Sequence, residues 1–226
     1  MPSIEKKYDM PSIAVIIPTF NESDFIDKCL LQPALQDFNQ VIVVDGGSTD
    51  DTREKLRALP KLTLLNCEVT NRAAQMNLGA DANTCDLLLF LHADTLLPAN
   101  TAQLLRKQFH NGKKCGCFNR QFTPASVLLD FTSEMAYWRS RLFFWSYGDQ
   151  ALFFSKELFQ QLSGYRNLCS FEDLDICLRA KRVSKHCVID TPIQTSARRF
   201  ADAPLKVLFK DFALSLRYLT GWYRPR

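Results

Sequence analysis

The first half of the chain alternates short apolar runs with amphipathic stretches. Continuous apolar runs occupy Ile13–Ile17, Val41–Val44 and Leu87–Leu91, and Leu62–Leu65 indicates another strand. Such runs are typical of strands that are buried on both faces of a parallel sheet. The stretches between them predict helices over about Glu22–Leu35, Asp50–Leu59 and Asn71–Asn83. Strands that alternate with helices in this way predict right-handed βαβ units and an α/β fold.

The second half has a different pattern. Its expected elements are a strand over Lys114–Phe122, an aromatic-rich segment over Phe131–Tyr147, a short apolar run at Ala151–Phe154, a helix over Leu174–Arg182 and a short strand at Val188–Ile189. After Pro204 the sequence predicts an amphipathic helix. One face of that helix carries Leu205, Leu208, Phe209, Phe212, Leu216 and Leu219. With no repeat and no linker, we expect one domain over 1–226.

Composition narrows the class of protein. Of 226 residues 46% are hydrophobic, which excludes a disordered chain. The net charge of +4 is too small and too spread to favour nucleic acid as the main partner. The eight cysteines show no C-x-x-C spacing, and the polar first ten residues predict no signal peptide. We therefore expect a reduced, cytoplasmic protein; a structural zinc site stays open.

Polar residues follow three of the predicted strands. Pro18-Thr19-Phe20-Asn21-Glu22, Asp45-Gly46-Gly47-Ser48-Thr49-Asp50 and His92-Ala93-Asp94 each come directly after an apolar run. The carboxyl ends of parallel strands lie along one edge of the sheet, where open α/β sheets bind ligands. We therefore expect these loops to converge on one crevice.

Each loop has a chemical interpretation and a structural one. Asp45 suits hydrogen bonds from a ribose or base, and Gly46 allows close backbone approach, whereas Ser48–Asp50 suits a helix cap. Asp94 suits a Mg²⁺ or Mn²⁺ ion that is shared with substrate phosphates. The same residue could instead cap a helix that starts near Pro98. His92 is either a metal ligand or a supporting group.

Three acids open the helix that carries Arg179. Of Glu172, Asp173 and Asp175, Asp173 is the candidate general base, because neighbouring carboxylates raise its proton affinity. Asp175 is instead expected to pair with an arginine. Arg72 and the pair Arg198-Arg199 suit a nucleotide and its diphosphate, although exposed salt bridges would explain them equally well.

With these motifs assembled, the chain resembles family-2 glycosyltransferases with a GT-A fold. The matching pieces are IIPTFNE (16–22), VIVVDGGSTDDT (41–52), RAAQMNLGA (72–80), LLFLHADT (88–95), GDQALFF (148–154), EDLDICLR (172–179) and TSARRF (195–200). Together HAD, GDQ and SARRF are most similar to a compact bacterial subgroup associated with radical-SAM and selenoprotein domains. The resemblance implies a Rossmann-like, mixed and mainly parallel sheet flanked by helices. It also implies that the single domain has a nucleotide-binding half (1–110) and an acceptor half (111–226).

The resemblance also implies roles. The residues expected to line the nucleotide pocket are Pro18, Thr19, Asn21, Glu22, Asp45, Gly46, Arg72, Asn77 and Gln150. Asp94 would be the last acid of an Asp-x-Asp motif whose first acid is replaced here by His92. Asp173, with Glu172 beside it, would be the catalytic base of an inverting transfer. Arg199-Phe200 would take the place of an Arg-Trp pair that borders the diphosphate.

The implied partners are a nucleotide-sugar donor and an acceptor hydroxyl, which a lipid would carry if the chain contacts a membrane. Lys206, Lys210, Arg217, Arg224 and Arg226 surround the last helix, as in interfacial helices on anionic lipid. Packing of this helix on the sheet, or on a second copy in a homodimer, stays open.

Other functions remain to be weighed. A sugar-phosphate nucleotidyltransferase would need a glycine-rich loop after the first strand, and an NAD-dependent oxidoreductase would need G-x-G-x-x-G there. Both are absent at 18–22. A catalytically inactive nucleotide-sugar-binding module stays open because of His92.

Overall fold

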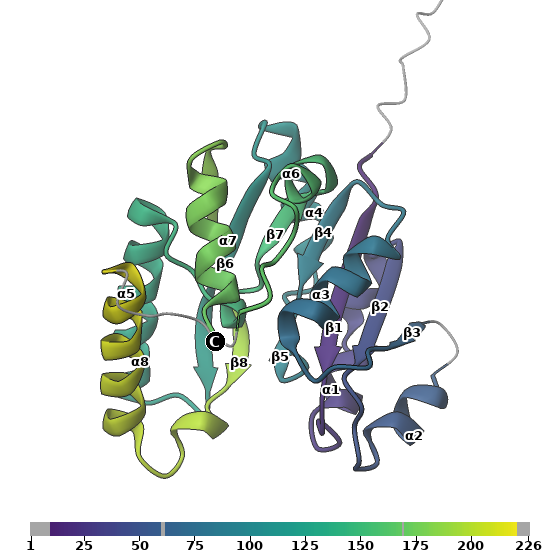
Figure 1. Cartoon of the computed structure of the whole chain (residues 1–226), viewed down its shortest axis with the longest axis horizontal. Helices are drawn as coiled ribbons and strands as arrows, with labels where there is room; N and C mark the ends of the chain where they lie inside the picture. The colour runs from purple at the N-terminus through teal and green to yellow at the C-terminus, as the bar shows by residue number, and fades with distance from the viewer. Residues whose placement is uncertain (1–9, 60–61, 169, 221–226) are drawn as a thin grey trace, which may run out of the picture.

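The computed structural model describes residues 10–59, 62–168 and 170–220. Within these residues eight strands form one sheet in the order β3-β2-β1-β4-β7-β6-β8-β5 (Figure 1). The strands are β1 (Ile13–Thr19), β2 (Gln40–Asp45), β3 (Thr63–Asn66), β4 (Leu87–Phe90), β5 (Thr95–Leu96), β6 (Cys115–Thr123), β7 (Phe153–Ser155) and β8 (His186–Ser196). The sheet therefore runs without a break from the first half of the chain into the second.

Strand direction divides the sheet. β3, β2, β1 and β4 are parallel neighbours, which makes the first half a Rossmann-like unit. β7 runs antiparallel to both β4 and β6, while β8 runs parallel to β6 and antiparallel to β5. The sheet is thus mixed and mainly parallel, as predicted.

Helices cover both faces of the sheet. The main α-helices are α1 (Ile26–Leu30), α2 (Thr52–Arg57), α3 (Arg72–Asp81), α4 (Thr101–His110), α5 (Val127–Phe143), α6 (Lys156–Gln161), α7 (Glu172–Lys181) and α8 (Pro204–Leu219). Alternate residues of β1 enter two different cores. Val15 packs among residues of α1, α2 and α4, whereas Ile16 packs among residues of α3, α6 and α7. This two-sided burial explains why β1 is apolar at every position from Ile13 to Ile17.

The predicted helix over Glu22–Leu35 is not one helix. The structure has the short α1 and then a 3₁₀ turn, η1 (Pro33–Asp37). Proline lacks an N–H and disfavours helical geometry in the residue before it, and Gln32 is accordingly extended, with ψ of 137°. Pro33 therefore ends the helix that the apolar spacing alone would continue.

Other boundaries differ as well. The short strand expected at Val188–Ile189 is part of the eleven-residue β8, which pairs with β6. The aromatic-rich segment is largely helical, because α5 covers Val127–Phe143 and is capped by the Ser126 hydroxyl. Seven cysteines of the described residues are free. Arg224 and Arg226 lie outside the described residues.

Candidate active site

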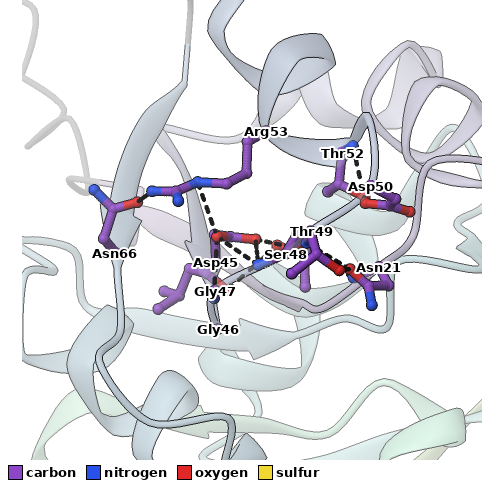
Figure 2. Close-up of polar contacts among 12 residues, drawn as sticks. Asn21, Asp45, Gly46, Gly47, Ser48, Thr49, Asp50, Thr52, Arg53 and Asn66 are labelled. Carbon is purple, nitrogen blue, oxygen red and sulfur yellow. Dashed lines mark hydrogen bonds and ion pairs between the residues drawn. The ribbon is translucent and has the colours of Figure 1, made fainter.

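The loops after β1 and β2 are joined by polar contacts around Asp45 (Figure 2). Asp45 Oδ2 accepts hydrogen bonds from the N–H groups of Gly47 and Ser48, each at 3.1 Å. The Ser48 hydroxyl donates to Asp45 Oδ1 and accepts the Asn21 N–H at 2.9 Å. Arg53 Nε lies 3.3 Å from Asp45 Oδ2. The Asp45 carboxylate is buried and already engaged by these donors, so in this structure it orders the two loops.

The ends of β1 and β2 are also fixed from the α3 side. Pro18 and Thr19 end β1 beside the end of β2, and the Gln75 amide donates to the carbonyl oxygens of Thr19 and Val44, both at 2.8 Å. A Cβ on Gly46 would lie 3.0 Å from this amide. A side chain at Gly46 would therefore push the Gln75 amide out of its place.

Glu22 and Asp94 are bridged by one arginine. Arg198 Nε lies 3.1 Å from Asp94 Oδ2, and a terminal nitrogen of Arg198 lies 2.6 Å from Glu22 Oε1. The guanidinium also covers the Phe25 ring, 4.4 Å from its centroid. Glu22 Oε2 is buried without a hydrogen-bond partner among the described residues. Arg198 thus ties the loop after β1 to the loop after β4.

Arg198, and not the predicted Arg199, is the arginine that lies next to Asp94. Arg199 pairs with Asp211 of α8 at 2.6 Å, away from Asp94. Arg198 and Arg199 are neighbours in a 3₁₀ turn, η3 (Arg198–Phe200), so their side chains point in different directions. The suggestion that Asp94 caps the next helix is wrong, because that helix, α4, begins after Asn100.

Asp173 and His92 meet at Gly148. Asp173 Oδ2 accepts the Gly148 N–H at 2.9 Å, while Asp173 Oδ1 is buried without a partner among the described residues. A Cβ on Gly148 would lie 2.3 Å from His92 Nε2 and 2.7 Å from Asp173 Oδ2. The two polar atoms therefore flank one point of the backbone. His92 Nε2 is likewise buried and unpartnered within the described residues.

Burial sets the protonation of this pair. Burial and, to a smaller extent, the neighbouring Glu172 carboxylate raise the pKa of Asp173 to about 7, although Arg72 and the Gly148 N–H act in the opposite direction. Burial also lowers the pKa of His92 well below its ordinary value, and the positive charges of Arg72 and Arg198 act in the same direction. The site thus holds a neutral imidazole beside a carboxyl group that titrates near neutrality.

Arg72 connects the two halves of the site. It begins α3, is half exposed, and lies 4.0 Å from Glu172 Oε1. Its positive charge influences both His92 and Asp173. Residues from the loop after β4, the start of α3 and the start of α7 therefore share one electrostatic environment.

Three predicted residues have structural contacts. Both amide atoms of Asn77 bond the Tyr165 backbone, at 2.8 and 2.9 Å, so this amide fixes a loop in place of lining the nucleotide pocket. Gln150 is fully buried and bonds Ser140, which places it inside the acceptor half. Asp175 was expected to pair with an arginine, and it pairs with Arg179 at 2.6 Å and with Arg166 at 3.2 Å.

The structure thus gathers a subset of the predicted residues. Glu22, Asp94 and Arg198 lie together, and His92, Asp173 and Gly148 lie together. Sequence reasoning left Gly148 without a role, although the motif GDQ contains it. The sequence signal that could have indicated Gly148 is its place just before the apolar run Ala151–Phe154, since a glycine in a turn often marks a point where a side chain has no room.

The donor set fits a divalent cation that is held mainly by its substrate. In the described part of the chain, no three His, Cys, Asp or Glu side chains gather to hold a metal ion. Mg²⁺ needs only one or two carboxylates when substrate phosphates supply further oxygens. Asp94 would meet that requirement with its carboxylate free of Arg198, which contacts it in this structure. His92 Nε2 lies instead at Gly148, beside Asp173.

Carboxylates and arginines lie at the carboxyl edge of this Rossmann-like sheet, which is where open α/β sheets bind their ligands. The sequence profile of Glycosyl transferase family 2 matches residues 14–162. The chain belongs to this family.

Similar proteins agree with this assignment. Glycosyltransferase AglE of Haloferax volcanii is 33% identical over 94 residues, which are 38% of this chain and 31% of that protein. The GalNAc(5)-diNAcBac-PP-undecaprenol beta-1,3-glucosyltransferase of Campylobacter jejuni is 39% identical over 54 residues, 23% of this chain and 18% of that protein. The matches thus span less than a third of these curated relatives.

Two solved structures share the fold. TarS 1–349 of S. aureus superposes with a TM-score of 0.68 at 18% identity, covering 82% of this chain and 60% of that chain. The mannosyltransferase PcManGT of Pyrobaculum calidifontis, in complex with GDP-Man and Mn²⁺, gives 0.64 at 20% identity, covering 84% and 57%. The GT-A fold expected from the motifs is confirmed.

Proposed function

We propose that this chain transfers a sugar from a nucleoside-diphosphate donor to an acceptor hydroxyl with inversion at the anomeric carbon. The observation that carries the proposal is the Asp173 carboxyl. It is buried, one oxygen is held by the Gly148 N–H, and the other oxygen has no partner among the described residues. Its raised pKa, about 7, suits a general base near neutral pH.

In this mechanism Asp173 Oδ1 accepts the proton of the acceptor hydroxyl. The oxygen attacks the anomeric carbon in line, the bond from that carbon to the diphosphate oxygen breaks, and no covalent enzyme intermediate is needed. Arg198 and Arg72 stabilise the charge that develops on the departing nucleoside diphosphate, as guanidinium groups do for phosphates. Asp94 would hold a Mg²⁺ or Mn²⁺ ion, which neutralises diphosphate charge when bound.

The relatives suggest the substrate classes. Solved structures with a similar fold contain UDP-GlcNAc or GDP-Man. The Campylobacter relative is named for an acceptor linked to undecaprenol diphosphate, and a Methanococcus voltae relative is named for a dolichyl phosphate substrate. We therefore propose a lipid-linked hydroxyl as the acceptor. Membership of the radical-SAM-associated subgroup stays a prediction.

The proposal is tested first by donor binding. A panel of UDP- and GDP-sugars with Mn²⁺ should include one that raises the unfolding temperature, since a ligand at about one hundred times its dissociation constant adds about 2.7 kcal/mol of stability. That donor should then be hydrolysed slowly or transferred to an acceptor.

The second test concerns the base. Asp173→Asn should keep donor binding and lower kcat by about 10²–10⁴-fold, the usual contribution of a general base. The control is Asp190→Asn, an exposed acid on β8 that pairs with Arg141. Undiminished turnover of Asp173→Asn would place the base elsewhere. Donor binding by a wild-type chain that never turns over would instead favour an inactive binding module.

A further inference from the structure

We propose that helices α5 and α8 form a docking surface for an anionic lipid bilayer. A row of five exposed apolar side chains lies along each helix, and Phe143 at the end of α5 is exposed as well. Those of α5 are Val127, Phe131, Met135, Trp138 and Leu142, and those of α8 are Leu205, Phe209, Phe212, Leu216 and Leu219. Single exposed apolar residues are ordinary on a protein surface, but two adjoining rows of them mark an interaction site.

The two rows belong to one surface. Leu129 of α5 and Val207 and Leu208 of α8 pack in the same small apolar cluster. The helices lie next to each other at one edge of the molecule, remote from the nucleotide-binding half (Figure 1). Because the inner sides of α5 and α8 are thus occupied, their exposed rows are left without a partner among the residues that the structure describes. We call these ten side chains the α5–α8 surface.

Charge identifies the occupant of this surface. Lys206, Lys210 and Arg217 are exposed and lie on one side of α8, next to its apolar row. Asp211 is the acid within α8, and it is engaged by Arg199. The α8 row is therefore flanked by positive charge, the arrangement of a helix that lies in the interface of an anionic membrane. Pairing two copies through α8 would instead bring these cations together. The α5 row is bordered by Asp130 and Glu134, and Glu134 accepts a hydrogen bond from Trp138, so the contact with anionic lipid is assigned to α8 first.

The bilayer would be contacted from one side. In the described part of the chain no helix is long and apolar enough to cross a membrane. α8 is sixteen residues long and amphipathic, which suits a position parallel to the lipid surface.

The inner side of α8 contacts the residues around the base. The Ser215 and Tyr147 hydroxyls lie 2.6 Å apart, and Tyr147 precedes Gly148 in the chain. The Tyr218 hydroxyl donates to Asp175 Oδ1 at 3.0 Å. A docked α8 would therefore hold the acceptor half against the membrane, within reach of a lipid-borne hydroxyl. The proposal that the α5–α8 surface binds lipid does not depend on the proposed function. Only the suggestion that docking presents a lipid-borne acceptor to the site rests on that function.

Vesicle flotation with the full chain tests the surface without donor or acceptor. The chain should float with vesicles of equal phosphatidylglycerol and phosphatidylcholine, and much less with pure phosphatidylcholine. Leu205→Ser with Phe209→Ser should lower the partition coefficient about a hundredfold, because each large side chain contributes about a factor of ten or more when it leaves water. The matched control is Leu31→Ser with Val183→Ser, which removes apolar side chains that are similarly exposed on other elements.

A charge pair completes the test. Lys206→Glu with Lys210→Glu should abolish the preference for anionic vesicles, whereas Arg57→Glu with Lys107→Glu, the same charge change on α2 and α4, should leave partitioning within about twofold. Circular dichroism verifies the fold of each variant.

Three outcomes would overturn the proposal: no flotation of the wild type, equal losses in the controls, or a dimer in sedimentation that Phe209→Ser dissolves while no vesicle binding occurs. A chain that transfers sugar to a soluble acceptor but never floats would refute docking and leave the proposed function standing. A chain that floats but binds no donor would refute the proposed function and leave docking standing.

Discussion

Gly148→Ala is the substitution that most directly tests the geometry around Asp173. The added Cβ would lie 2.3 Å from His92 Nε2 and 2.7 Å from Asp173 Oδ2, both well inside contact distance. Both side chains are tightly enclosed, so the clash is relieved only by moving them or the η2 turn (Gly148–Gln150) that carries the glycine. Overpacking of this kind costs about 1–3 kcal/mol.

The loss of activity should exceed what the loss of stability explains. Misplacing a catalytic group by about 1 Å lowers the rate about 10²-fold, so we expect kcat/KM of Gly148→Ala to fall by about that factor while the donor still binds. Urea unfolding measures the stability term, and initial rates with the donor found by the binding screen measure the second. Retention of kcat/KM within about twofold would show that Gly148 does not hold the base.

Two further variants isolate the cause. Gly112, after α4, has φ of +73° and no atom near the position of its missing Cβ. Gly112→Ala should therefore cost about 1 kcal/mol of backbone strain without a change in rate. Adding His92→Ala to Gly148→Ala removes the nearer of the two clashes. The double variant should recover part of the stability lost in the single one, and simple additivity of the two costs would contradict the contact.

The remaining predictions concern charge. Burial raises the pKa of Asp173 from 3.8 to about 7, so the folded chain holds a proton between about pH 4 and pH 7 that the unfolded chain releases. As the pH rises through that window, the free energy of unfolding of the wild type should therefore fall relative to that of Asp173→Asn, by at least about 1 kcal/mol in urea unfolding. A difference between the two proteins that does not change with pH would refute this prediction. Activity of the wild type should rise through the same window. Arg198→Ala should weaken donor binding about tenfold or more by calorimetry, whereas Arg199→Ala should change it little, and the opposite order would restore the motif-based assignment. Asp175→Asn should destabilise the fold by about 3 kcal/mol in urea unfolding, because it leaves Arg179, which is mostly buried, without its partner.

The parallel half of the fold was predictable because its signal is local. β1, β2 and β4 are continuous apolar runs, and the Asn71 side chain caps α3 as the sequence suggests, accepting the Ala74 N–H at 3.0 Å. β8 gives no such signal. Most of its residues are only partly buried, it contains Pro192, and it pairs with β6 across an irregularity between Phe118 and Asn119. Its length depends on the partner strand, which no local pattern encodes.

The sequence indicated where the residues of the site lie, at the ends of the strands, better than it indicated which side chains contact one another. Chemistry at strand ends follows from topology, and Glu22 and Asp94 are accordingly linked through one arginine. Which arginine makes the link is a different question. Arg198 and Arg199 are chemically identical neighbours, and only the rotation of the η3 turn sends one to Asp94 and the other to Asp211. A family motif aligns residue types, but it does not fix that rotation.

His92 shows how a departure from a motif acquires a new explanation once the fold is known. Along the sequence it stands where an acid is expected, which leaves open whether it is a metal ligand or a supporting group. In space its Nε2 and Asp173 Oδ2 lie within 2.3 and 2.7 Å of the same point, the position of a Cβ on Gly148. A second carboxylate at this point would repel Asp173 and raise its pKa further, whereas a neutral imidazole adds no charge. We therefore propose that the proximity of Asp173 favours the imidazole, and that a cation would depend on Asp94 and on the phosphates of its substrate.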